Sequence, residues 1–362
     1  MRILHVLNHT GRLNGNVHAA IDLACAQAEL GHEVAVASGW GSFDAMLAAN
    51  GVETIRIDQS RRPLVAAAAV ASLAKLMRHR RFDVAHAHMM TSALLCWPAC
   101  KIAGVPLVTT VHNEFERSAA VMGVGRRVIA VSSAVARSME RRGIPAGRLR
   151  TVLNGTVGSP RHAGPPGSPV ALGSPSILFV GGLHPRKGVP DLLEAFGIVA
   201  GVIPGATLHV VGEGPCEAEY KAAAAAMPCA AAITFHGGKD DPRPWFQGAD
   251  VFAFPSHAEP AGLVLSEACE AGCAIVASDV GGIPEMLDGG KAGVLVPPRS
   301  PAQLAAALIA LLTVPGALVE GGRLALANAS RMSLARVARE TLDVYRECFA
   351  SRPSVQAGQL RF

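Results

Sequence analysis

The chain has 362 residues, of which half are hydrophobic and only 4% are aromatic. This length exceeds what one hydrophobic core usually holds, so we expect two domains of about 150 to 180 residues each. Lys and Arg outnumber Asp and Glu by 19 to 10 in residues 1–171, whereas the acidic residues are in the majority, 18 to 14, in the rest of the chain. The basic residues do not alternate with aromatic ones, which argues against a nucleic-acid-binding protein.

The cysteines and the N-terminus indicate a reducing compartment. None of the eight cysteines forms a Cys-x-x-Cys pair, and Cys96/Cys100 and Cys269/Cys273 lie four residues apart in apolar runs, which predicts buried thiols. The chain begins with an apolar strand and a glycine loop, not with the pattern of a signal peptide. The longest apolar run without charges, residues 63–74, is too short to cross a bilayer. We therefore expect a cytoplasmic protein, and its many Arg and Ala residues are typical of a bacterial one.

Short apolar strands alternate with helical segments through the first half of the chain. The predicted strands are residues 2–8, 34–38, 54–57, 84–88, 107–112, 128–131 and 149–153. The predicted helices are residues 14–30, 64–80, 92–103 and 133–142. This alternation favours a parallel, doubly wound α/β sheet.

Residues 155–176 interrupt the pattern with a run rich in Gly, Pro and Ser, which is typical of a linker. The alternation then restarts, with predicted strands at 177–181, 206–211, 232–236, 251–254, 274–277 and 292–296. The predicted helices are residues 189–200 and 218–226, one that begins near 262, and 301–312, 317–329 and 334–350. We expect domains at 1–158 and 176–333, a linker at 159–175, a last helix at 334–350 that packs back on the first domain, and a flexible tail at 351–362.

Three loops of the second half carry residues that suit a phosphorylated ligand. Gly182 and Lys187 follow the strand at 177–181, where glycine lets the backbone approach a phosphate and lysine supplies a positive charge. Gly212 lies in a second turn of this kind, and neither loop has the pattern of a P-loop. In the third loop, Glu259 precedes a helix that carries Glu267. The start of that helix is a site for a phosphate, and the two carboxylates are placed to bracket a sugar nucleotide.

The sequence predicts no metal site. Asp240 and Asp241 lie in a turn flanked by proline and do not follow a buried strand. No His, Cys and carboxylate residues have the spacing of metal ligands along the chain. We therefore expect no metal and no cofactor.

The order of the loops resembles the retaining nucleotide-sugar glycosyltransferases of family four, which have the GT-B fold. The resemblance covers nearly the whole chain and rests on the motifs Gly181-Gly182 to Lys187-Gly188, Gly212-Glu213-Gly214-Pro215, Phe235-His236-Gly237, Pro255-Ser256, Glu259, Gly262, Glu267-Ala268 and Gly281-Gly282. It implies two Rossmann-like doubly wound parallel-sheet domains that face each other across a cleft.

The resemblance also implies roles for single residues. Glu267 would hold the ribose hydroxyls, Glu259 would lie beside the donor sugar, and Lys187 would neutralise the leaving group. His112 ends the strand at 107–112 and would face the transferred sugar, whereas His86 and His88 are interpreted as core or wall of the crevice. The implied catalytic residues are His112, Glu259 and Lys187. The implied donor-binding residues are Gly182, Arg186, Lys187, Gly212, His236, Gly237, Glu259, Gly262, Leu263, Val264 and Glu267. Gly15 and Asn16 would bind the acceptor.

Three positions depart from the family pattern. Gly182 stands where members commonly carry Arg, and Asn16 stands where a second glycine is common. Thr156-Val157 replaces the end of an Asn-Gly-Val-Asp turn, so the acidic residue of that turn is missing.

The resemblance implies transfer of a sugar, with retention, from a nucleoside-diphosphate sugar to the hydroxyl of a glycan or lipid-linked acceptor. The setting would be bacterial envelope or extracellular glycan synthesis. The basic first half favours peripheral contact with the anionic inner face of the membrane. Three alternatives stay open: a sugar-nucleotide epimerase, a glycan phosphorylase, and a non-catalytic nucleotide-sugar-binding protein.

Overall fold

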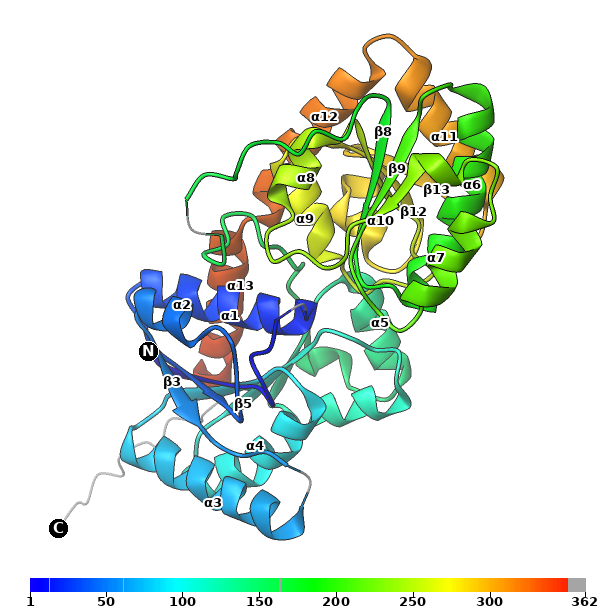
Figure 1. The fold of residues 1–362 in the computed structure, drawn as a ribbon. Coiled ribbons are helices and arrows are strands. Elements are labelled where there is room, and N and C mark those ends of the chain that lie inside the picture. The colour runs from blue at the N-terminus through cyan, green and yellow to red at the C-terminus, as the bar shows by residue number, and fades with distance from the viewer. Residues whose placement is uncertain (13, 61, 163, 351–362) are drawn as a thin grey trace, which may run out of the picture.

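The computed structural model describes residues 1–12, 14–60, 62–162 and 164–350. It contains two parallel sheets, of seven and six strands, each covered by helices, which makes two Rossmann-like domains (Figure 1). The predicted α/β fold class is confirmed. The expected tail at 351–362 lies outside the described residues.

The sheet of the first domain has the strand order β3-β2-β1-β4-β5-β6-β7. The direction of winding reverses at β1, which lies between β2 and β4, and ligands of such sheets bind outside the carboxyl ends of the strands near this point. Every residue of β4 and β5 is buried, as expected for a sheet covered on both faces. The strands are β1 (Arg2–Val6), β2 (Glu33–Ser38), β3 (Val52–Arg56), β4 (Val84–Ala87), β5 (Leu107–Val111), β6 (Arg127–Ala130) and β7 (Leu149–Thr151).

The helices of the first domain include one that the sequence did not predict. The short helix α2 buries a single side chain, Leu47, so it leaves no periodic pattern to detect. The start of α1 is fixed by Asn14, whose side chain accepts hydrogen bonds from the backbone N–H groups of Asn16 and Val17. The helices are α1 (Gly15–Glu29), α2 (Asp44–Ala49), α3 (Pro63–His79), α4 (Met90–Ala103) and α5 (Ser133–Arg141), with the 3-10 helices η1 (Arg117–Val124) and η2 (Ala146–Arg148).

The sheet of the second domain has the order β10-β9-β8-β11-β12-β13. Its strands are β8 (Ser176–Val180), β9 (Thr207–Val211), β10 (Ile233–Phe235), β11 (Val251–Phe254), β12 (Ala274–Ser278) and β13 (Val294–Val296). Its longer helices are α6 (Val189–Val202), α7 (Glu217–Ala225), α9 (Leu263–Glu270), α11 (Pro301–Thr313) and α12 (Ala317–Asn328). The sequence did not predict α8 (Arg243–Gly248) or α10 (Ile283–Met286), which are too short to show a helical period. The remaining 3-10 turns are η3 (Pro185–Lys187), η4 (Ala230–Ala232), η5 (Asp288–Gly290) and η6 (Ala329–Met332).

The last helix, α13 (Leu334–Ala350), leaves the second domain and packs beside α1 of the first (Figure 1). Its apolar face joins the core that α1 and β1 form, and its largest buried side chain is Tyr345, which has no exposed surface. The four cysteines of the predicted buried pairs are buried, and all eight cysteines of the chain are free.

Within the described residues, no single helix meets the length and hydropathy expected of a membrane span. One pair of segments, Pro301–Thr313 and Ala317–Met332, meets them only in combination, and the two are bent by 105°.

Candidate active site

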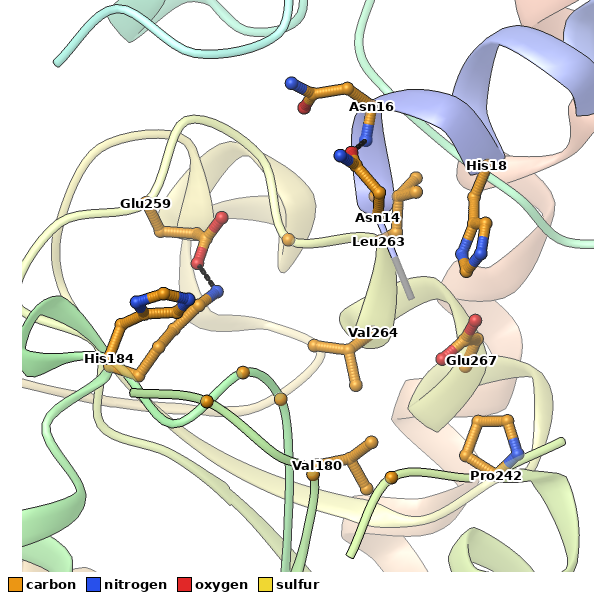
Figure 2. Close-up of a pocket in the computed structure, with 18 of the residues that line it drawn as sticks. Asn14, Asn16, His18, Val180, His184, Pro242, Glu259, Leu263, Val264 and Glu267 are labelled. Carbon is orange, nitrogen blue, oxygen red and sulfur yellow. Dashed lines mark hydrogen bonds and ion pairs between the residues drawn. The ribbon is translucent and has the colours of Figure 1, made fainter. Parts of the chain in front are cut away.

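A cavity of about 590 Å³ lies between the two domains and is lined by residues of both (Figure 2). The loops that line it follow β1, β5 and β7 of the first sheet and β8, β9, β10 and β11 of the second. These are carboxyl ends of parallel strands, where the sequence analysis placed the candidate residues.

Lys187 and Glu259 both line the cavity and form an ion pair, although they lie 72 positions apart in the sequence; Figure 2 shows Glu259 with this interaction as a dashed line. Lys187 ends η3, after β8, and Glu259 lies in the loop after β11. Their side chains are only 12% and 7% exposed. A charge pair this far from bulk water is weakly screened, so its field acts strongly on any ligand beside it.

Two glycines allow close contacts between loops that line the cavity. A Cβ atom on Gly212, whose φ is +146°, would lie 1.9 Å from the carbonyl oxygen of Gly181. A Cβ atom on Gly281, whose φ is +58°, would lie 2.0 Å from the carbonyl oxygen of Glu259. Only glycine fits at either position. The loop after β9 can therefore contact the loop after β8, and the loop after β12 can contact the loop that carries Glu259.

Helix α9 begins at the cavity. Its N-cap is Gly262, which has no side chain to cap the helix, so the N–H groups of Leu263 and Val264 have no acceptor within the helix. Figure 2 shows both side chains between Glu259 and Glu267. Backbone N–H groups at a helix start form a site for an anion such as a diphosphate.

Glu267 lies one turn further along α9 and also lines the cavity. Burial raises the pKa of its carboxyl group to about 7, although the nearby Arg161 cation opposes the shift. The charge of Glu267 therefore changes within the physiological pH range.

Arg161 is a residue of the site that the sequence analysis missed. It lies in the segment predicted as a linker, yet its side chain is only 4% exposed. Its guanidinium group pairs with Asp22 of α1 at 3.0 Å and with Glu267 at 3.6 Å. It thereby ties the first domain to the second at the cavity. No sequence pattern marked it, because its partners lie 139 and 106 positions away.

The first domain contributes Asn14, Gly15, Asn16 and His112 to the cavity wall. Gly15 and Asn16 begin α1, and His112 follows β5 directly. The structure thus brings the candidate acceptor-binding residues and the candidate catalytic histidine to the same space as Lys187. Two candidate residues do not line this cavity: His236 and Gly237. Their successors, Gly238 and Lys239, line it instead, and the ring of His236 bonds to that of His209 at 3.0 Å.

Contacts beside the cavity hold the two domains together. The Ser132 hydroxyl donates to the carbonyl oxygen of Pro260 at 2.6 Å, and the backbone N–H of Ser133 donates to Glu285 at 2.6 Å. The carboxylate of Glu285 lies at the N-terminus of α5, where the helix dipole stabilises a negative charge. The domains are therefore joined along one side of the cleft by buried polar contacts.

Asp240 and Asp241 occupy the predicted turn and are paired with arginines: Asp240 with Arg12 at 2.8 Å and Asp241 with Arg243 at 2.8 Å. Among the residues that the structure describes, one group has the spacing of metal ligands: His5, His86 and His88. All three are buried, and they belong to β1, to β4 and to the position that follows β4.

Two family models match the chain. Residues 13–157 match the model described as Glycosyltransferase Family 4, and residues 174–314 match the one described as Glycosyl transferases group 1. Glycogen synthase of Mycobacterium tuberculosis is 31% identical over 291 residues, which are 74% of this chain and 69% of that protein. D-inositol 3-phosphate glycosyltransferase of Acidothermus cellulolyticus is 30% identical over 315 residues, 77% of this chain and 70% of that protein.

The chain belongs to the group 1 glycosyltransferases. It is therefore a transferase, and the resemblance found in the sequence is confirmed at this level. Solved structures support the GT-B fold. Anabaena HepE in complex with UDP-glucose superposes with a TM-score of 0.80 at 20% identity, over 97% of this chain and 100% of that one. Sucrose-phosphate synthase from Thermosynechococcus elongatus has a TM-score of 0.77 at 21% identity, with 97% and 100% covered.

Proposed function

We propose that this glycosyltransferase moves a sugar from a nucleoside-diphosphate sugar to the hydroxyl group of a glycan or lipid-linked acceptor, with retention and without a metal ion. One observation carries the proposal: the Lys187 ammonium, on a side chain that is only 12% exposed, and the uncapped start of α9 line the same cavity. Together they offer a diphosphate a positive charge and free N–H groups. The complexes of HepE with UDP-glucose support this class of donor.

The remaining residues of the cavity fit the other parts of such a donor. Glu267 accepts hydrogen bonds from the two ribose hydroxyls, and Glu259 lies beside the sugar. Gly182, Arg186 and Gly212 border the diphosphate, and Gly238 and Lys239, which line the cavity in place of His236 and Gly237, lie nearest the base. The acceptor enters from the first domain, past Gly15, Asn16 and His112.

Transfer then follows as a displacement on one face of the sugar. The acceptor oxygen forms a bond to the anomeric carbon, while the bond from that carbon to the diphosphate oxygen breaks. The departing phosphate oxygen takes the acceptor proton. The configuration is retained because the acceptor bonds to the face of the anomeric carbon that the diphosphate leaves. Lys187 and the N–H groups of Leu263 and Val264 stabilise the negative charge that develops on the diphosphate.

A panel of UDP-, GDP- and ADP-sugars tests the donor site by the shift in melting temperature that each produces. We expect the sugar nucleotide with one of the three bases to raise the melting temperature of the wild type. The same ligand should not change the melting temperature of Glu267→Ala, because this variant has lost the contact to the ribose. If a sugar nucleotide stabilises both proteins equally, Glu267 is not the ribose ligand. Release of free nucleoside diphosphate only when an acceptor is present separates a transferase from an epimerase.

The pKa of Glu267 gives donor binding a pH dependence. At pH 8 the carboxylate is ionised and accepts from both hydroxyls, whereas below pH 7 it takes up a proton and loses part of this capacity. The Kd for the sugar nucleotide is expected to rise as the pH falls, approaching about tenfold per pH unit below 7. Titrations by calorimetry measure it. Glu267→Gln should bind weakly at every pH; a slope that persists in this variant would show that another group titrates.

We further propose that the first domain contacts a membrane surface through α3 and α4. Leu94, Trp97 and Lys101 follow one another at helical spacing on α4, and the two apolar side chains are 52% and 43% exposed. Leu64 at the start of α3, which packs against α4, is 86% exposed. An apolar patch beside basic residues suits an anionic lipid surface.

Cosedimentation with vesicles that contain anionic lipid tests this surface. Leu94→Ser/Trp97→Ser is expected to pellet at least about tenfold less than the wild type, because it lacks the two apolar side chains that would insert into the bilayer interface. Val319→Ser, which removes a 79% exposed apolar side chain from the second domain, is the control. Equal pelleting of all three proteins would show that α3 and α4 do not contact the membrane.

A further inference from the structure

A continuous chain of hydrogen bonds runs from His112, at the cleft, through the interior of the first domain. Nε2 of His112 bonds to Nδ1 of His88 at 3.1 Å, and Nε2 of His88 bonds to Nδ1 of His5 at 2.8 Å. Nε2 of His5 then donates to the side-chain oxygen of Gln27 at 2.8 Å. These residues come from β1, α1, and the ends of β4 and β5. A wall residue of the cleft is thus connected to a buried side-chain amide of α1.

The series of hydrogen bonds continues beyond Gln27. Its side-chain nitrogen donates to the hydroxyl oxygen of Tyr345, on α13, at 3.4 Å. The Tyr345 hydroxyl donates to Nδ1 of His86 at 2.6 Å, and Nε2 of His86 donates to the hydroxyl oxygen of Thr110 at 2.7 Å. Gln27 therefore joins two series of hydrogen bonds, since its side-chain oxygen bonds to His5 and its side-chain nitrogen bonds to Tyr345.

Burial favours the neutral form of the four imidazole rings in this hydrogen-bonded network, those of His5, His86, His88 and His112. Burial lowers the pKa of His5 and of His112 to about 4, and it lowers the pKa of His86 and His88 well below 6.5. A neutral imidazole carries one N–H group and one lone pair. Each ring that bonds through both nitrogens must then donate on one side and accept on the other, so the chain has a direction.

The orientation of the Gln27 amide sets that direction. Its oxygen can only accept, so Nε2 of His5 carries the proton and Nδ1 of His5 accepts. It follows that Nε2 of His88 donates to His5 and that Nε2 of His112 donates to His88. The Nδ1 atom of His112 is left with a lone pair. This atom makes no hydrogen bond to any residue in the described part of the chain, and its side chain lines the cavity.

The same histidines are the group with the spacing of metal ligands. His5, His86 and His88 offer nitrogen atoms within 4.8 Å of one another. Both nitrogens of every one of these rings already take part in a hydrogen bond. A metal ion would have to break the chain, whereas a set of fixed tautomers satisfies every buried nitrogen.

We propose that Gln27 is a positioning residue that acts through His5 and His88 to hold His112 in the Nε2–H tautomer, with the Nδ1 lone pair presented to a substrate hydroxyl group in the cleft. That this hydroxyl belongs to a sugar rests on the proposed function. A neutral amide does not take up a proton at pH 7, so the chain orients His112 and does not carry protons away. His112 then selects a hydrogen-bond donor, a hydroxyl, at this point of the cleft.

The tautomer itself can be measured in the wild-type protein without substrate. Protonated and unprotonated imidazole nitrogens give separate 15N NMR signals, and a spectrum of His112→Gln assigns the signal of His112 among the 13 histidines. We expect Nε2 protonated and Nδ1 unprotonated from pH 6 to 8. A protonated Nδ1 overturns the proposal, whether or not the protein transfers a sugar.

Gln27→Met tests the source of the tautomer, because it keeps the volume and removes the amide. We expect a mixture of both His112 tautomers and a fall in kcat of about 10- to 100-fold, with the donor Kd within twofold of the wild type. Asn328→Ala is the matched control, since it removes a buried amide of the second domain that donates to the carbonyl oxygen of Met286 at 2.8 Å. It should lose stability and keep the wild-type tautomer. An unchanged tautomer in Gln27→Met overturns the role of Gln27.

The two proposals fail separately. If no nucleotide sugar binds the wild type, the proposed function is wrong, while the NMR spectra still decide the tautomer. If the sugar nucleotide binds and His112 has the opposite tautomer, only the inference about Gln27 is wrong.

Discussion

Lys187→Ala is expected to lower kcat by at least about a hundredfold, the usual effect of removing one preorganised donor from a developing anion. Lys187 lines the same cavity as the start of α9 and its side chain is only 12% exposed, so no solvent cation replaces its ammonium group. The melting temperature should also fall, because Glu259 would remain buried without its partner. Steady-state kinetics with the donor found in the panel measures the first effect.

Two variants separate catalysis from stability in this experiment. Lys187→Met/Glu259→Gln removes both charges, so it should regain much of the melting temperature and none of the lost turnover. Lys221→Ala, an exposed lysine paired with Glu217 on α7, should change neither quantity. Near-normal turnover in Lys187→Ala would remove this residue from the mechanism.

Arg161→Met is expected to cost about 3 to 5 kcal/mol of stability, the typical effect of breaking a buried ion pair by removing one partner. Arg161 is the cation that faces Asp22, which is fully buried, and Glu267. Burial raises the pKa of the Asp22 carboxyl group, and Arg161 opposes this shift. Without Arg161 both carboxyl groups bind protons more tightly in the folded protein than in the unfolded chain.

The sign of the pH dependence follows from this. Between the unfolded and folded pKa values of the two carboxyl groups, the folded variant holds more protons than the unfolded chain, so its stability falls as the pH rises. The loss caused by Arg161→Met should be larger at pH 8 than at pH 5. Thermal unfolding across this range measures it. Arg80→Met, which breaks the exposed pair with Glu53, should cost less than about 1 kcal/mol. A loss that is just as small for Arg161→Met would contradict the structural role of Arg161.

The sequence predicted the two sheets because their strands are buried on both faces and alternate with helices of regular period. It failed where an element is too short for a period, as in α2, α8 and α10. The tight Gly212 and Gly281 turns were visible only as glycines. The contacts that make them necessary, with the Gly181 and Glu259 carbonyl oxygens, lie outside any local window.

In the candidate site too, the residues marked by local sequence patterns could be predicted, and those marked only by contacts distant in the sequence could not. Lys187, Glu259 and Glu267 stand in loops whose residue types indicate a phosphate and a sugar, and the structure places all three on one cavity. Arg161 could not be predicted, because a Gly, Pro and Ser-rich segment indicates a hinge, and only the folded chain shows its guanidinium group between two carboxylates. His86 and His88 were interpreted as core or wall of the crevice, and the structure places both in the core. Their bonds to Tyr345 and His5 depend on strand register and on the return of α13.

A crystal soaked with the sugar nucleotide in the presence of a chelator shows which groups of the protein bind the diphosphate. We expect the diphosphate at the N–H groups of Leu263 and Val264, within hydrogen-bond distance of Nζ of Lys187, and with no divalent ion. An unoccupied interdomain cavity under saturating ligand, or a diphosphate that appears only when magnesium or manganese bridges it to the protein, would contradict the account.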